Sequence, residues 1–348
     1  MGGSPAGSPT RRGTCVSSSQ ANLFWWLPSL RERATTNRLT LPQPGIPNEL
    51  VLSTSCFGAR LKAIEDQAFA AVAMGFRRLE LGLSDRPPTM TGWEDSRRET
   101  GIRVDSVVVG ALNPRSEHMS GSLLGSSDVE ERERALNSSR RHIRMAQSMQ
   151  APTVVVRGCA VEDTTLAHEA ADLSSQLISV PTDDREAVLE NVRDFVQRVQ
   201  RKGQKQLEHF CRSLHSLRTE FPETKIAVEP GLHFNDLLNF EAMQWTLDDL
   251  ASQGVGYWHD TGRIHQREMS GLPSQGDWLD AFAGRMLGMH LQDAAADEAE
   301  MPPGQGEVDF KLVVEYLPST AARVLEMNPR HGRAEVLAAI QCLLDLGF

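Results

Sequence analysis

The chain of 348 residues lacks any run of about 18 apolar residues, the minimum for a helix that spans a bilayer. It also lacks an excess of basic residues: 36 Lys and Arg stand against 46 Asp and Glu, for a net charge of −10. Nucleic-acid binders usually carry a basic stripe or excess, so this balance disfavours that class. Five cysteines without a CxxC pair disfavour a disulfide framework and a thiolate zinc site. We expect a protein of a reducing, cytoplasmic compartment.

The charge is unevenly distributed along the chain. Residues 1–48 hold five arginines and one acid, whereas residues 49–348 hold 31 bases and 45 acids. The first segment is rich in Ser, Pro and Gly, and its one apolar cluster, residues 23–27, is shorter than a signal-peptide core. Residues 1–48 are therefore predicted to be a disordered extension, or a stretch read from an upstream start codon. An organellar transit peptide is the alternative, because this start is rich in Ser and Arg and poor in acids.

Short apolar, β-branched runs recur after residue 48. Apolar residues occupy both faces of these runs, which indicates strands buried on both sides. The runs are 50–55, 77–82, 102–109, 153–157, 225–229, 255–260, 287–292 and 323–327. Helical patterns lie between them at 61–74, 128–149, 187–220, 240–252 and 333–346, the third with a potential break at Gly203. The second and seventh intervals carry weaker helical patterns.

Eight strands that alternate with helices within 300 residues predict an α/β fold, a closed (β/α)8 TIM barrel over residues 49–348 as a single domain. An open doubly wound sheet is the alternative. Its usual marker is missing, because residues 55–59 after the first strand read SCFGA and not GxGxxG. Residues 159–186 hold seven acids and one arginine and form either a lid or a disordered loop.

The last four predicted strands each end in a residue that can bind a metal ion. These residues are Glu229, Asp260, His290 and Glu326. Side chains alternate along a strand, so each shares a face with the residue two positions earlier, which is Ala227, Trp258, Gly288 or Val324. Those four are small or apolar, as a barrel interior requires. The four candidate ligands therefore point toward the barrel axis at the catalytic end of the fold.

Three carboxylates and one imidazole form a hard, oxygen-rich ligand set. It suits one divalent ion, Mn²⁺, Mg²⁺ or Co²⁺, and Zn²⁺ remains open. Taken singly, each glutamate could be an ion-pair partner and the histidine a structural residue. No obvious set of buried Lys or Arg is available to pair them, however, and unpaired buried carboxylates are costly. A divalent cation would remove that cost.

Residues 50–348 resemble the sugar phosphate isomerase/epimerase family of xylose-isomerase-like barrels. The resemblance rests on the order and spacing of the four candidate ligands, on HDTG at 259–262, and on PPGQGEVDF at 302–310. It implies that Glu229, Asp260, His290 and Glu326 bind one metal ion and that Glu229 and Glu326 are the catalytic acid and base. The two glutamates would lie on opposite sides of a sugar and exchange a proton next to its carbonyl, through an enediolate that the metal holds. The function implied is sugar or sugar phosphate isomerisation or epimerisation.

The chain departs from the family pattern at several positions. The family commonly has Asp-x-x-His on the sixth strand, whereas here Arg263 takes that place and His265 follows. The resemblance leads us to consider both, with the remaining pocket residues, as candidates for substrate binding. Those candidates are Arg263, His265, Arg157, Glu80, Phe57 and Gln292. For Phe57 core packing is the alternative, and for Glu80 and Arg157 a structural ion pair.

Three other functions stay open. A dehydratase that acts on a polyol or keto acid would use the same proton abstraction. An apurinic endonuclease of the same superfamily would need histidines after the second to fourth strands, where this chain has Gly82, Gly110 and Arg157. The third is a sugar-binding barrel without turnover. We expect a small-molecule partner in carbohydrate metabolism, no nucleic acid and no membrane, and a homo-oligomer is open.

Overall fold

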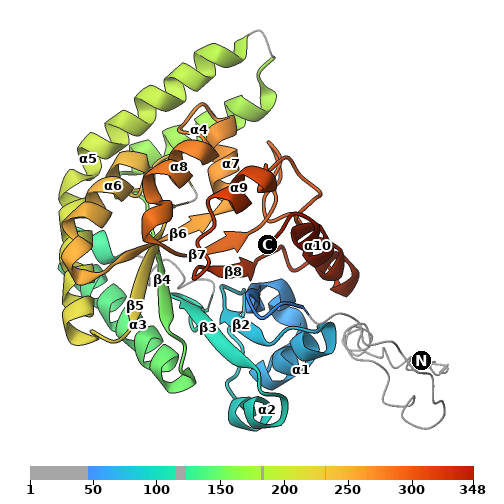
Figure 1. Cartoon of the computed structure of the whole chain (residues 1–348). Helices are drawn as coiled ribbons and strands as arrows, with labels where there is room; N and C mark the ends of the chain where they lie inside the picture. The colour runs from blue at the N-terminus through green and yellow to red at the C-terminus, as the bar shows by residue number, and fades with distance from the viewer. Residues whose placement is uncertain (1–45, 115–122, 182–183, 232) are drawn as a thin grey trace, which may run out of the picture.

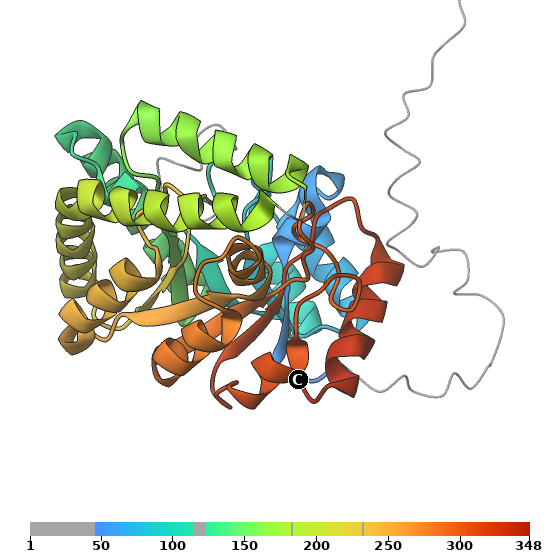
Figure 2. The ribbon, with the colours of Figure 1, turned by 90° about the horizontal axis from the view of Figure 1, so that it is seen from above.

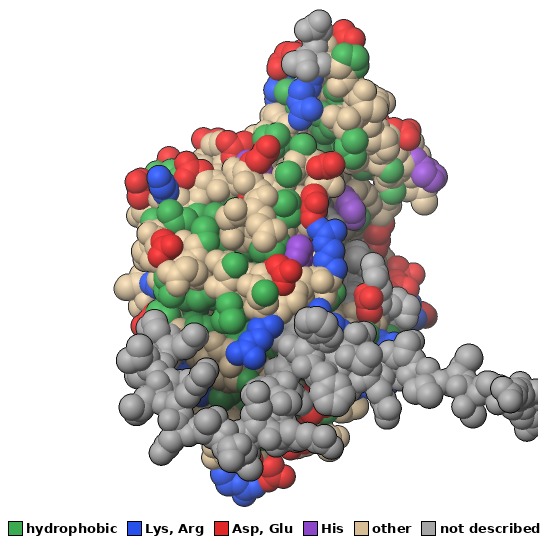
Figure 3. All heavy atoms as spheres, turned by 90° about the vertical axis from the view of Figure 1, so that its right-hand side faces the viewer, with side chains coloured by type: hydrophobic (Ala, Val, Ile, Leu, Met, Phe, Trp, Pro, Cys, Tyr) green, Lys and Arg blue, Asp and Glu red, His purple; other side chains and the backbone are tan. Residues whose placement is uncertain are grey.

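In the computed structural model, residues 46–114, 123–181, 184–231 and 233–348 are described. The expected extension, residues 1–48, therefore lies almost wholly outside the described residues. Among the described helices, none joins the length and the apolar composition needed to cross a bilayer. On the face shown in Figure 3, Lys and Arg side chains are interspersed with Asp and Glu side chains.

Eight parallel strands close into a barrel in chain order, with β8 paired to β1 (Figure 1). This confirms the predicted TIM barrel, and each strand begins and ends within two residues of its predicted position. The strands are β1 (Leu50–Ser53), β2 (Arg78–Leu81), β3 (Arg103–Val108), β4 (Thr153–Arg157), β5 (Lys225–Glu229), β6 (Gly256–Asp260), β7 (Met286–Leu291) and β8 (Ala322–Leu325). Glu326 and Gln292 therefore lie one residue past the strands that carry them.

The helices surround the barrel (Figure 1). They are α1 (Ile64–Met74), α2 (Trp93–Thr100), α3 (Val129–Met149), α4 (Thr164–Ser179), α5 (Arg185–Glu220), α6 (Phe240–Asp249), α7 (Thr261–Met269), α8 (Gln275–Phe282), α9 (Phe310–Glu315) and α10 (Arg333–Asp345). Local signals set several ends. Helix α1 stops at Gly75, whose left-handed φ of 108° suits glycine. Helix α3 starts at Asp128, whose carboxylate accepts from the amides of Glu130 and Glu131.

Two expectations about the long segment after β4 are corrected. Helix α5 continues through Gly203 without a break. A side chain at Gly203 would meet Val161 and Leu237 at 2.8 and 2.9 Å. Glycine is thus present for close packing. Residues 164–179, expected within a loop, form α4, which Asp163 caps and which lies beside the first part of α5 (Figure 2). Ion pairs from Lys202 and Arg198 to the acids of α4 hold the two helices antiparallel.

The core has two layers. A large apolar cluster lies between the strands and the helices, and a smaller one fills the barrel itself. The inner cluster consists of Val51, Val108, Val155, Ala227, Trp258 and Val324. Three of the four residues expected beneath the metal ligands belong to it. The fourth, Gly288, leaves the space for the Trp258 ring, which a side chain at that position would meet at 2.4 Å.

Candidate active site

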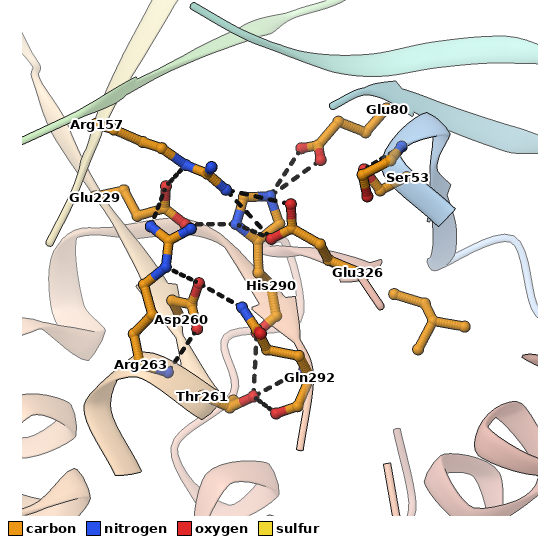
Figure 4. A network of polar contacts seen from close by, with 12 residues as sticks. Ser53, Glu80, Arg157, Glu229, Asp260, Thr261, Arg263, His290, Gln292 and Glu326 are labelled. Carbon is orange, nitrogen blue, oxygen red and sulfur yellow. Dashed lines mark hydrogen bonds and ion pairs between the residues drawn. The ribbon is translucent and has the colours of Figure 1, made fainter. Parts of the chain in front are cut away.

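The four predicted ligands converge at the carboxyl end of the barrel (Figure 4). One ligand atom from each of Glu229, Asp260, His290 and Glu326 lies within 4.8 Å of the others, and all four residues are buried. Twice a metal–ligand bond of about 2.2 Å is about 4.4 Å, so small side-chain rotations would bring all four onto one ion. The four side chains thus meet as predicted, and their role as metal ligands stays a prediction.

The HDTG segment places the Asp260 carboxylate. Asp260 caps α7 by accepting a hydrogen bond from the Arg263 amide at 2.9 Å, and Gln292 Nε2 donates to its other oxygen at 2.7 Å. Thr261 Oγ1 donates to the Gln292 carbonyl at 2.6 Å and so ties α7 to the end of β7. A side chain at Gly262 would meet Gln292 at 2.9 Å. Thr261 and Gly262 therefore help to position the Asp260 carboxylate together with Gln292, whose Oε1 has no hydrogen-bond partner among the described residues; substrate binding by Gln292 stays a prediction.

His290 is held between carboxylates on both sides of its ring. Its Nε2 lies 3.0 Å from Glu80 Oε1, and its Nδ1 lies 2.5 Å from Glu229 Oε1 (Figure 4). Ser106 Oγ donates to the other oxygen of Glu80 at 2.7 Å. Burial lowers the pKa of His290, but the carboxylates of Glu326, Glu80 and Glu229 outweigh it and raise that pKa well above its usual value. Glu80 thus holds the ring of His290, and its part in substrate binding stays a prediction.

Two arginines enter the same cluster. Arg157 Nε lies 2.5 Å from Glu229 Oε2, and its Nη2 lies 3.2 Å from Glu326 Oε1. Arg263 Nη1 lies 3.3 Å from Glu229, and its Nε lies 3.1 Å from Asp260 (Figure 4). The expectation that no buried arginine pairs these carboxylates was therefore wrong. Arg157 lies opposite Glu229 on the neighbouring strand β5, whereas its contact with Glu326 crosses the barrel and forms only when the barrel closes.

The arginines determine the protonation of the two glutamates. Burial alone would raise the pKa of Glu229, but Arg157 and Arg263 lower it well below the usual value. The pKa of Glu326 is also lowered, because His290 and Arg157 together outweigh the effect of burial. Asp260 differs: burial raises its pKa, and Arg263 only partly opposes this. Glu229 and Glu326 are thus carboxylates at neutral pH, the form that can accept a proton.

The residues present fit a divalent ion. The buried acids Glu80, Glu229, Asp260 and Glu326 carry four negative charges, and Arg157 and Arg263 offset two of them. Binding of the ion would release the proton that the raised pKa keeps on His290, and with the neutral ring the two charges that remain match one divalent cation. If His290 Nε2 donates to Glu80, its Nδ1 lone pair faces the carboxylates of the ligand set, which is the arrangement a metal-binding histidine needs. The same oxygens are shared with Arg157, which would have to move.

Two further candidates lie apart from the cluster. His265 is on α7, where its Nε2 faces Glu307 at 3.9 Å. Phe57 is fully buried in the layer between strands and helices, so core packing accounts for it.

One residue was not foreseen. The carboxylate of Asp293, just past β7, accepts from the amides of Gly304 and Val308 at 2.8 and 3.0 Å. It holds the PPGQGEVDF loop, and a side chain at Gly306 would meet it at 2.5 Å. Its position three residues after His290 is the only sequence signal that it gives.

A sequence profile of the xylose isomerase-like TIM barrel family matches residues 63–345. The chain belongs to the xylose isomerase-like TIM barrel family. No curated protein sequence matches the chain.

Solved structures of the same fold include several epimerases. A D-tagatose 3-epimerase-like protein is 13% identical with a TM-score of 0.61, over 85% of this chain and 96% of that one. L-ribulose 3-epimerase is 13% identical with a TM-score of 0.58, over 86% and 93%. 3-Keto-D-glucoside 4-epimerase from E. coli is 14% identical with a TM-score of 0.57, over 86% and 100%. At these identities the likeness establishes the fold alone.

Proposed function

We propose that this xylose isomerase-like barrel is a metal-dependent isomerase or epimerase that acts on a sugar or a related compound. It would move a proton on a carbon next to a carbonyl. The observation that carries the proposal is the pair of buried carboxylates, Glu229 and Glu326, in one ligand set with Asp260 and His290. Similarity of fold to sugar epimerases supports the same reaction class.

Glu229 and Glu326 are the proposed acid and base. Both are ionised because cationic groups lower their pKa, so either can remove the α-proton of a ketose. For epimerisation the other carboxylate, after taking a proton from solvent, would deliver that proton to the opposite face of the same carbon; for isomerisation the carboxylate that removed the proton would deliver a proton to the neighbouring carbon.

Asp260, His290, Glu229 and Glu326 would hold the metal ion. Mn²⁺, Mg²⁺ or Co²⁺ suits three carboxylates and one imidazole, and Zn²⁺ also accepts this set. When bound, the ion would supply Lewis-acid stabilisation of the negative charge that develops as the proton leaves. Arg157, at the edge of the same cluster, would place a second positive charge near that position.

The test is exchange of the α-proton with solvent. Ketoses and ketose phosphates incubated with the protein and Mn²⁺ in deuterated water should gain deuterium next to the carbonyl. NMR would identify the carbon, and product analysis would separate epimerase from isomerase and both from a dehydratase, which releases water. Glu229→Gln and Glu326→Gln should each abolish exchange.

The matched control is Glu223→Gln. Glu223 is exposed in the turn before β5, at the opposite end of the barrel. This variant should retain exchange. Full activity of both Glu229→Gln and Glu326→Gln would disprove the assigned roles.

A further inference from the structure

A small basic cavity adjoins the carboxylate cluster. It has a volume of about 160 Å³ and lies between the end of α4, the start of α5, helix α7 and the loops after β5 and β7. Its basic lining residues are Arg185, Arg263, Arg267 and His233, and no acid is found among the described residues that line it. Whole-ligand sites usually measure about 300–1,000 Å³, so this cavity suits one substituent rather than an entire sugar.

The cavity and the carboxylate cluster share the side chain of Arg263. The guanidinium of Arg263 contacts the carboxylates of Glu229 and Asp260, and the same side chain forms part of the cavity wall. A molecule whose reactive carbonyl lies at Glu229 would extend a second group past the Arg263 side chain to reach the cavity. The residues around Arg263 determine the chemistry of the group that the cavity can bind.

Two of the three arginines that line the cavity, Arg185 and Arg267, form no ion pair among the described residues. Arg185 donates to the backbone carbonyls of Leu177 and Met269, and within the described part of the chain it forms no ion pair. Arg267 is only 4% exposed, yet its Nε has no hydrogen-bond partner among the described residues, and its Nη2 reaches only the His233 carbonyl at 3.4 Å. A buried guanidinium with a free donor is costly unless an anion completes it.

The electrostatics agree with this geometry. Burial lowers the pKa of Arg267, the carboxylate of Asp236 only partly offsets the effect, and the charge of Arg263 lowers the pKa further. Arg263 is already paired with Glu229 and Asp260, so Arg267 and Arg185 are the cavity arginines that form no ion pair among the described residues. An oxyanion is the ligand that planar arginine forks bind best.

We infer that this cavity is an anion subsite, so the substrate carries a phosphate or carboxylate group in addition to its carbonyl. The inference rests on the proposed function for the place of the reactive end. Arg185 and Arg267, with Arg263 at the border, would bind the anion and orient the sugar. The substrate class is thus a ketose phosphate or a keto sugar acid rather than a neutral ketose.

Binding measurements on the full chain test this without turnover. Calorimetry would compare D-fructose, D-fructose 6-phosphate and D-fructuronate, which share the ketose head, together with inorganic phosphate. At least one anionic sugar should bind about tenfold or more tightly than D-fructose, because two charge-assisted contacts are gained. Whichever anionic sugar prevails identifies the group.

Two variants test whether the arginines of the cavity cause the preference for the anionic sugar. Arg267→Gln and Arg185→Gln should each remove most of the preference for the anionic sugar and leave the affinity for D-fructose within about twofold, since they change only the charge of the subsite. The matched control is Arg201→Gln, an exposed arginine of α5 outside the cavity, which should keep the preference. Thermal melts would verify folding; if Arg267→Gln fails to fold, Arg185→Gln and the wild-type comparison decide.

Equal affinity of wild type for D-fructose and both anionic sugars would overturn the inference. So would the absence of binding of phosphate and both anionic sugars at millimolar concentration, or a preference unchanged in both variants. Deuterium exchange on neutral ketoses but not on the anionic sugars would support the proposed function and contradict the subsite. An arginine-dependent preference without exchange on any sugar would support the subsite and contradict the proposed reaction.

Discussion

At the scale of single residues, Arg157 has two opposing effects on the candidate metal site. It occupies the carboxylates that a metal ion would use, because it pairs with Glu229 and Glu326 at once. A nearby positive charge repels a cation more strongly in a buried site than in water. Arg157 is therefore expected to weaken metal binding while holding the two glutamates ionised.

Removal of that charge should strengthen metal binding. In Arg157→Gln we expect Mn²⁺ to bind about tenfold or more tightly, because the competing cation is gone. Titration calorimetry of the purified chain measures this without a substrate. Arg201→Gln is the control and should bind Mn²⁺ as the wild type does. An unchanged or weaker affinity in Arg157→Gln would show that the arginine does not compete with the ion.

Glu80 acts at the same scale through His290. Its carboxylate holds Nε2 of that ring and is itself held by Ser106. Glu80→Gln should weaken Mn²⁺ binding by about 10–100-fold, the usual effect of losing a carboxylate that orients a metal-binding histidine. Ser106→Ala should have a smaller effect in the same direction, and the exposed Glu94→Gln none. Unaltered affinity in Glu80→Gln would mean that Glu80 does not position a ligand.

At the scale of elements, the long helix α5 depends on a glycine for its packing. The backbone at Gly203 lies against Val161, in the segment between β4 and α4, and against Leu237 after β5. This close approach fixes α5 beneath the segments that border the site. The expectation of a helix break at Gly203 was wrong, because this glycine allows close packing against Val161 and Leu237, which are distant in the sequence.

Gly203→Ala should destabilise the protein although alanine is the better helix former. The gain in helix propensity is at most about 1 kcal/mol, whereas overpacking costs about 1–3 kcal/mol. We expect a net loss of about 1 kcal/mol in the free energy of unfolding, measured by urea denaturation. Gly276→Ala in α8 is the control, since the added methyl meets its neighbours at 3.7 Å or more. A more stable Gly203→Ala would show that Val161 and Leu237 can move aside.

At the scale of the whole molecule, the burial of His259 couples folding to pH. His259 is fully buried beside the site, and its Nδ1 is 2.8 Å from the Tyr257 hydroxyl. Burial lowers its pKa from 6.5 to about 3. The unfolded chain therefore binds a proton between these values that the folded chain does not. The stability from neutral His259 is complete above 6.5 and is lost as the pH falls toward 3.

The free energy of unfolding should therefore decrease as the pH is lowered from about 7 to about 5, by at most about 1.4 kcal/mol per unit from this residue. His259→Gln should show a smaller decrease over this range, because Gln carries no titrating proton. Urea denaturation at several pH values measures the slope. His215→Gln, at an exposed position on α5, should keep the wild-type slope. Identical slopes in wild type and His259→Gln would exclude this residue as a source of acid sensitivity.

The sequence by itself determined the barrel, its strands and the four ends that carry Glu229, Asp260, His290 and Glu326. These follow from local patterns, because strand periodicity, helix caps and strand-end residues can all be recognised from residues that are close together in the sequence. Only the tertiary structure decided which charges meet. Arg157 and Glu80 were recognised as pocket candidates, but Arg157 also contacts Glu326 and Glu80 contacts His290 across the barrel, and only the closed barrel brings these groups within hydrogen-bond distance. The same holds for the basic cavity, whose walls come from five segments that only the fold brings together.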